Sequence, residues 1–263
     1  MRNADSHIEA GTQPAAETKV DRLYDDPDLA SFYDVENVWS SDQDYCRLLA
    51  AGCASVLDLG CGTGWLAAEL AGERTVFGVD PAEAMLEIAR TRPGGDRVTW
   101  VRGDGRSVRL GRRFDLIVLT GHAFQVFLTP EDRLAALRTI AAHLAPGGRF
   151  IFDSRNPARE EWREWTPAES ARRIEHPRFG TAEAWNDVEH EPDTGIVTYG
   201  TFYRIVADGR VLSSRSRIAF PPREQLERLI GEAGLAVDTW LGDWTGAPWT
   251  PSSCDFIPLG RLD

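Results

Sequence analysis

The sequence lacks the features that would place the protein in a membrane or outside the cell. No eighteen apolar residues run together, which predicts that no helix spans a bilayer. The first 20 residues are polar and have no apolar core, so we expect no signal peptide. The four cysteines do not have the spacing of a zinc knuckle, and they are too few for a disulfide scaffold. These features predict a cytoplasmic protein with reduced thiols.

Positive charge is also scarce. Lys and Arg together number 29 against 41 Asp and Glu, which gives a formal net charge of −12. A chain this acidic gains nothing from the phosphate neutralisation that dominates nucleic-acid binding, so we expect no nucleic-acid partner. Arginines do cluster between residues 102 and 113, and we interpret this segment as a solvated loop whose charges are offset by nearby acids.

The 263 residues, 42% of them hydrophobic, suffice for one large α/β domain with an insertion. We expect a disordered tail at 1–20, a helical lid and the ligand-binding part of the core at 21–153, an inserted antiparallel cap over the substrate at 154–220, and the rest of the core at 221–263. The lid includes one helical segment at about 28–51. Strands expected at 56–60, 75–79, 98–102, 114–119 and 149–153 alternate with helices at 65–71, 82–90 and 130–144. This alternation predicts a parallel sheet covered on both faces.

The rhythm changes after residue 153. Residues 154–182 are irregular, and three strands in hairpin connection are expected at 184–191, 196–206 and 211–220. A helix at 221–233 and strands at 235–241 and 253–259 complete the pattern. The insertion is therefore predicted to be a small antiparallel layer on the α/β core.

A glycine-rich loop follows the first core strand, with Gly60, Gly62 and Gly64 at alternate positions. Glycines allow a tight turn and a close backbone approach to a ligand, which in open α/β sheets lies beyond the carboxyl end of the strand. Dinucleotide folds space their glycines differently, as G-x-G-x-x-G. Asp58, just before the loop, would repel a diphosphate, whereas the sulfonium and ammonium of S-adenosylmethionine are cationic. The charges therefore favour the methyl donor.

Two more acids follow the next core strands. Asp80 ends the second strand, where a carboxylate can accept hydrogen bonds from both ribose hydroxyls, although NAD folds carry an acid at a similar place. Asp104 follows the third strand and is suited to accept from an adenine amino group. Each acid alone could be a helix cap or a loop carboxylate. Three acids at successive strand ends favour a nucleoside-binding site.

These motifs, in order, resemble the class I S-adenosylmethionine-dependent methyltransferases. The matching segments are Asp58–Gly64, Gly78–Asp80 with Met85, Gly103–Gly105 and Leu144–Gly148. The resemblance implies a Rossmann-like, seven-stranded, mostly parallel sheet whose last strand is antiparallel, and S-adenosylhomocysteine as the product. It also implies donor-binding roles for Asp58 and Cys61 in the loop, for Gly60 and Gly62 along the methionine part, for Asp80 on the ribose, for Pro81 and Met85 on adenine, for Asp104 and Gly105 at the adenine edge, and for Thr120 beside the methionine end.

The segment after the fourth strand bears on the acceptor. Thr120-Gly121-His122-Ala123-Phe124 stands where enzymes that methylate nucleobases or protein glutamine carry Asn/Asp-Pro-Pro-aromatic. No Asp-Asp-Asn metal set is present, so no metal is implied. The amino-terminal aromatic and acidic pattern resembles glycine N-methyltransferases and deoxysugar N,N-dimethyltransferases. We therefore expect methyl transfer to an N or O atom of a small-molecule acceptor by a monomer or homodimer. An NAD- or FAD-dependent oxidoreductase and a non-catalytic S-adenosylmethionine-binding module remain alternatives.

Five side chains are candidates for the reaction itself. His122 could remove a proton near neutral pH or only hydrogen-bond the substrate. Tyr33, a second candidate for catalysis, and Trp39, a candidate for substrate binding, could close over the donor or serve packing. Arg155 and Asn156 follow the fifth strand and could hold a substrate carboxylate, or belong to a loop turned by Pro157.

Overall fold

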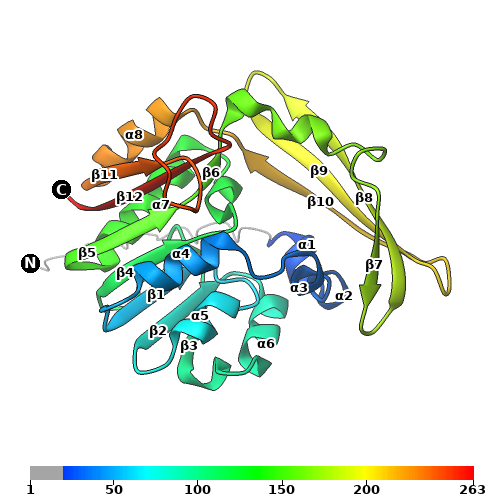
Figure 1. Cartoon of the computed structure of the whole chain (residues 1–263), viewed down its shortest axis with the longest axis horizontal. Coiled ribbons are helices and arrows are strands. Elements are labelled where there is room, and N and C mark those ends of the chain that lie inside the picture. The colour runs from blue at the N-terminus through cyan, green and yellow to red at the C-terminus, as the bar shows by residue number, and fades with distance from the viewer. Residues whose placement is uncertain (1–19) are drawn as a thin grey trace, which may run out of the picture.

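The central sheet has the strand order expected for a Rossmann-like core. The computed structural model describes residues 20–263, so the predicted tail lies outside the described residues except for Val20. The strands run in the order β11-β12-β5-β4-β1-β2-β3, and a short β6 pairs with β12 (Figure 1). Neighbours from β3 to β5 are parallel, whereas β12 is antiparallel to both β5 and β11. The predicted seven-stranded sheet with an antiparallel last strand is thus confirmed. The strands are β1 (Ser55–Leu59), β2 (Thr75–Asp80), β3 (Val98–Arg102), β4 (Phe114–Leu119), β5 (Leu144–Phe152), β6 (Ser154–Arg155), β11 (Leu235–Leu241) and β12 (Asp255–Leu262).

Helices cover both faces of this sheet. Leu57 faces a buried cluster formed with residues of α7 and α8, whereas its neighbour Val56 faces a second cluster formed with α4 and α5. Adjacent strand residues point to opposite faces, so β1 is apolar on both sides. The Thr129 side chain caps α7 by accepting from the Asp132 N–H. The core helices are α4 (Ser41–Leu49), α5 (Trp65–Leu70), α6 (Glu83–Thr91), α7 (Pro130–His143) and α8 (Arg223–Glu232).

The lid differs from the sequence expectation. The single helical segment predicted at about 28–51 is wrong, because it is divided into three helices, α2 (Pro27–Ala30), α3 (Tyr33–Glu36) and α4, and another short helix, α1 (Arg22–Asp25), precedes it. The Asp26 carboxylate accepts from the N–H groups of Asp28 and Leu29, and Pro27 occupies the first turn of α2. An acid cap followed by proline starts a new helix and ends the preceding one.

The insertion forms a second sheet of four antiparallel strands in the order β10-β9-β8-β7. Its strands are β7 (Arg172–His176), β8 (Gly180–Glu191), β9 (Ile196–Ile205) and β10 (Val211–Ala219), so the three predicted strands are confirmed and β7 is an addition. The helices α1, α2 and α3 lie between this sheet and the core (Figure 1). Phe32 of the lid stacks on Tyr203 of β9, with 4.0 Å between ring centroids. The lid is therefore packed onto the inserted sheet.

Candidate active site

The loop between β1 and α5 turns sharply at its glycines. Gly60 and Gly62 have φ of 79° and 53°, in the left-handed region that favours glycine. The N–H groups of Gly60 and Cys61 donate to the Val79 carbonyl at 2.7 and 3.0 Å, which ties the loop to β2. A Cβ built on Gly62 would first meet the Tyr33 ring, at 3.9 Å. The loop backbone is therefore exposed towards the lid, and a ligand can approach it there.

Two buried carboxylates flank this loop. Asp58 and Asp80 are 3% and 8% exposed. Burial, with the nearby Asp80 carboxylate, raises the pKa of Asp58 to about 7. Burial also raises the pKa of Asp80, against the opposing effect of the N–H groups of Ala82 and Gly62, which donate to it at 2.9 Å each. The charged groups that act on Asp58 are both acids, Asp80 and Asp42, so a cation bound here would relieve their repulsion.

A cavity between the loop and the lid is lined by some of the residues predicted to bind the donor, whereas Gly62 and Asp80 are not among its lining residues. Tyr33, Asp58, Gly60, Cys61 and Thr120 all line it. Further lining residues that the sequence analysis did not assign are Asp34, Asn37, Asp42, Gln43, Thr63, Trp65, Leu66 and Gly121. Asp34 and Asp42 belong to the aromatic and acidic pattern at the amino terminus. Their alternation with Tyr33 and Trp39 is the one sequence feature that points to a place in the site.

Tyr33 covers the cavity from the lid. Its hydroxyl oxygen lies 4.0 Å from a Cβ built on Gly62 and 3.7 Å from one built on Gly121, so it stands between the ends of β1 and β4. Burial and the surrounding carboxylates, led by Asp80, raise the pKa of Tyr33 well above its ordinary value. The phenol therefore stays neutral at pH 7 and can donate a hydrogen bond, but it is not a base.

The residues predicted around adenine lie outside this cavity. Met85 is buried under the lid in a cluster with Ala82, Tyr24 and Tyr33, whereas Pro81 is exposed. Asp104 accepts hydrogen bonds from the backbone and guanidinium of Arg106, which also bonds Asp132. Partial burial works in the opposite direction, but these bonds from Arg106 keep the pKa of Asp104 below its usual value. This ion-paired arrangement agrees with the interpretation of the arginine-rich segment.

Gly105 is also not among the residues that line the cavity. A Cβ built on it would meet the Phe127 ring at 3.2 Å. The adenine-side contacts of Pro81, Met85, Asp104 and Gly105 stay predictions.

His122 lies just past β4 with two carboxylates around its ring. Its backbone is left-handed (φ 59°), and its N–H donates to Oδ1 of Asp153 at 2.9 Å. Nε2 lies 3.0 Å from Oδ1 of Asp255 and 3.6 Å from Oδ2 of Asp153. Burial raises the pKa of Asp153, and His122 moderates that rise. Nε2 is thus the ring nitrogen that faces both carboxylates, and His122 is not among the residues that line the cavity, so its role in the reaction stays a prediction.

The three residues predicted to bind the acceptor have partners within the chain. Arg155 donates to Glu161 and Gln125, both at 3.0 Å, and its guanidinium lies over Trp165. Asn156 caps the N–H of Ala158 and donates to the Ser253 carbonyl at 2.9 Å, so both ends of its side chain fix the loop. The Trp39 ring packs edge-on against the cavity residue Trp65. Acceptor contacts by these residues stay predictions.

Within residues 20–263, no group of three or more His, Cys, Asp or Glu side chains is arranged to hold a metal ion. No helix in this same range is long and apolar enough to cross a membrane. The cysteines of this range, Cys46, Cys53, Cys61 and Cys254, are free thiols.

Comparison with known proteins agrees with this geometry. Residues 56–148 match the family described as a methyltransferase domain. A dTDP-3-amino-3,6-dideoxy-alpha-D-glucopyranose N,N-dimethyltransferase of Streptomyces fradiae is 29% identical over 92% of this chain and 94% of its own. The cypemycin N-terminal methyltransferase of a Streptomyces species is 37% identical, but the match covers 40% of this chain and 43% of that enzyme. The chain thus spans less than half of one relative and nearly all of the other.

Solved structures share the fold. The CcbJ methyltransferase from Streptomyces caelestis has a TM-score of 0.72 at 24% identity, covering 88% of this chain and 96% of its own. DesVI of Streptomyces venezuelae has a TM-score of 0.66 at 23% identity, covering 94% and 100%.

Residues 56–148 form a methyltransferase domain, and the chain has the fold of S-adenosylmethionine-dependent methyltransferases. In this methyltransferase the matched segment contains the glycine loop, both buried acids and His122, whereas the lid and the inserted sheet lie outside it. The segment common to the family thus provides the floor of the cavity, and the chain's own lid provides its cover.

Proposed function

We propose that this methyltransferase moves a methyl group from S-adenosylmethionine to an amino nitrogen of a small molecule, with a hydroxyl oxygen as the second candidate atom. The observation that carries the proposal is the pair of buried acids, Asp58 and Asp80, beside an open glycine loop. The chain-length similarity to an aminodeoxysugar N,N-dimethyltransferase supports an amine-bearing sugar nucleotide as the acceptor class.

The donor fits the residues around the cavity. When bound, S-adenosylmethionine supplies a methyl group already activated by the positive charge on sulfur. Asp58 and Asp42 place negative charge at the cavity, and the Gly60–Gly62 backbone allows close approach. Asp80 lies where its carboxylate can accept hydrogen bonds from the ribose hydroxyls in place of the Gly62 N–H. Neutral Tyr33 closes the site against water and offers a hydrogen bond.

His122 is the proposed base. With the ring proton on Nε2, which faces Asp255, Nδ1 can take a proton from the protonated acceptor, the ammonium form, and leave the neutral amine. The lone pair of the amine then forms the N–C bond as the C–S bond breaks. A base is required only when the acceptor arrives protonated, whereas alignment in a closed site contributes roughly 7–11 kcal/mol in either case.

The test is transfer of isotope-labelled methyl from S-adenosylmethionine to paired acceptors. Each pair consists of an aminodeoxysugar nucleotide and the analogue with a hydroxyl in place of the amine. We expect label in the amine member and release of S-adenosylhomocysteine. Label in the hydroxyl member alone would reverse the assignment of the acceptor atom, and label in no small molecule would refute the proposal.

Four further expectations belong to the same proposal. The protein acts as a monomer or homodimer, it needs no metal, and it binds no nucleic acid. Its free thiols support a reducing compartment, the cytoplasm.

A further inference from the structure

Helix α3 provides part of the donor cavity but is too short to hold itself in place. It spans only four residues, Tyr33–Glu36, and Tyr33 and Asp34 line the cavity together with Asn37 just after it. Isolated helices of this length are not stable in water, so contacts outside the helix must fix its position.

One of those contacts joins α3 to the core. The Thr63 hydroxyl donates to Oδ1 of Asp34 at 2.6 Å, and the Arg92 guanidinium donates to the other carboxylate oxygen. The Arg92 Nε also donates to the Thr63 carbonyl at 3.0 Å. Asp34 is thereby attached to the end of the glycine loop.

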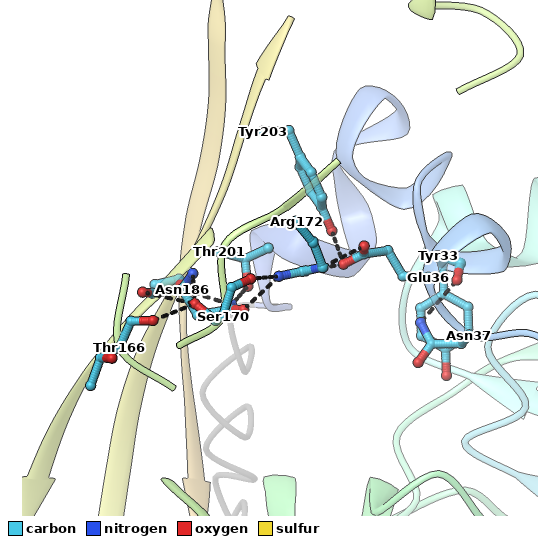
Figure 2. A network of polar contacts seen from close by, with 10 residues as sticks. Tyr33, Glu36, Asn37, Thr166, Ser170, Arg172, Asn186, Thr201 and Tyr203 are labelled. Atoms are coloured by element: carbon cyan, nitrogen blue, oxygen red, sulfur yellow. Dashed lines mark hydrogen bonds and ion pairs between the residues drawn. The ribbon is translucent and has the colours of Figure 1, made fainter. Parts of the chain in front are cut away.

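The second contact joins α3 to the inserted sheet, at strand β7 (Figure 2). Arg172 donates to the Glu36 carboxylate through Nε, at 2.8 Å, and through Nη2. The Tyr203 hydroxyl of β9 reaches the same carboxylate at 3.4 Å. Two parallel bonds from a guanidinium fix both the distance and the orientation of a carboxylate.

Arg172 is itself fixed before it meets Glu36. Its Nη1 donates to the Ser170 carbonyl at 2.9 Å and to Oδ1 of Asn186 at 3.1 Å. The Asn186 amide donates in turn to the Gly200 carbonyl of β9 at 3.0 Å. The guanidinium is therefore held in place by the inserted sheet. Its bonds to Glu36 fix α3 relative to that sheet.

We propose that Glu36 and Arg172 are positioning residues for the donor site: their ion pair holds α3 so that Tyr33 and Asp34 stand over the glycine loop. This inference rests on the proposed function. It makes the inserted sheet a determinant of donor affinity as well as of acceptor binding, although no residue of that sheet lines the donor cavity.

The test is calorimetry with S-adenosylhomocysteine on Arg172→Gln, beside thermal unfolding of the same sample. We expect binding to weaken by about 5–150-fold, the range usual for coupled sites. Arg178→Gln is the matched control, because Arg178 also joins the insertion to the lid, through Asp28 at 2.7 Å, but Asp28 lies on α2, and no residue of α2 lines the cavity. The control should bind within about twofold of the wild type.

Exchange of the two charges separates positioning from simple stability. The double variant Glu36→Arg with Arg172→Glu should recover most of the affinity that either single change loses, and Arg172→Lys should recover part of it. If Arg172→Gln fails to fold, Arg172→Lys and Glu36→Gln provide the same comparison.

Two results would overturn the inference. The first is a lowered Tm with unchanged S-adenosylhomocysteine affinity in the Arg172 and Glu36 variants, which would leave the pair a purely structural role. The second is equal weakening in Arg178→Gln. Absence of binding by the wild type would instead refute the proposed function itself, and with it this inference.

Discussion

Asp58→Asn should make the protein more stable and a poorer donor binder. In the folded chain the Asp58 carboxyl is 3% exposed, and the nearest charges acting on it are acids. Ionisation of this group is therefore costly in the folded state and free of that cost in the unfolded state. Asparagine has nearly the same shape and does not ionise.

The pKa of Asp58 sets the size and sign of the effect. A rise from 3.8 to about 7 corresponds to about 4 kcal/mol between the two protonation states. The folded protein holds this proton more tightly, so the associated stability is complete below pH 3.8 and is lost as the pH rises through 7. The buried amide carries a cost of its own, about 1–3 kcal/mol, so we expect a net gain of roughly 1–3 kcal/mol above pH 7.

Urea unfolding of wild type and Asp58→Asn between pH 8 and pH 5.5 measures this gain. Below pH 7 the advantage of the variant should shrink by about 1.4 kcal/mol per pH unit, because the wild type then recovers its proton. The control for a carboxyl-to-amide change elsewhere is Glu189→Gln, on the exposed surface of the inserted sheet. Asn156→Asp is unsuitable, because it would remove hydrogen bonds that hold a loop. A variant that is no more stable at pH 8, or whose advantage grows on acidification, would refute the reasoning.

Three further substitutions test separate parts of the site. Asp80→Ala should weaken S-adenosylmethionine and S-adenosylhomocysteine by about 1.5–3 kcal/mol in calorimetry, through lost hydrogen bonds to a charged acceptor, and unchanged affinity would remove Asp80 from the site. His122→Asn should lower turnover roughly 10²–10⁴-fold, whereas Asp255→Asn, which removes the contact to Nε2 of His122, should lower turnover less; full activity of His122→Asn would exclude it as a base. Arg155→Gln should raise the acceptor KM at constant donor affinity, and a parallel loss of both would contradict an acceptor role.

The core was predictable because its determinants are local. Short apolar runs separated by capped helices gave the strands, and the glycines after Leu59 and the acid at Asp80 each follow a strand end. Since carboxyl ends of parallel strands meet at one edge, residues distant in sequence could be placed at one site without knowing their contacts.

The lid and its attachments were not predictable in this way. The predicted helical segment at about 28–51 is interrupted twice, at residues 31–32 between α2 and α3 and at residues 37–40 between α3 and α4, although its aromatic spacing resembles one longer helix. Strand β7, Arg172–His176, has Ile174 as its one apolar residue and exposes Arg173 and Glu175, so its pairing with β8 decides its conformation. The approach of Asp255 to His122 joins residues 133 positions apart through the β12–β6 pairing, which no local pattern reports.

The most direct test of the account is titration of S-adenosylmethionine into the protein at pH 7, in two buffers of different ionisation enthalpy. We predict saturable one-to-one binding with release of about half a proton, because an Asp58 carboxyl with a pKa of about 7 is half protonated and must ionise beside the bound cation. Asp58→Asn should bind more weakly and release none. Absence of saturable binding, or the same proton release from Asp58→Asn, would contradict the account.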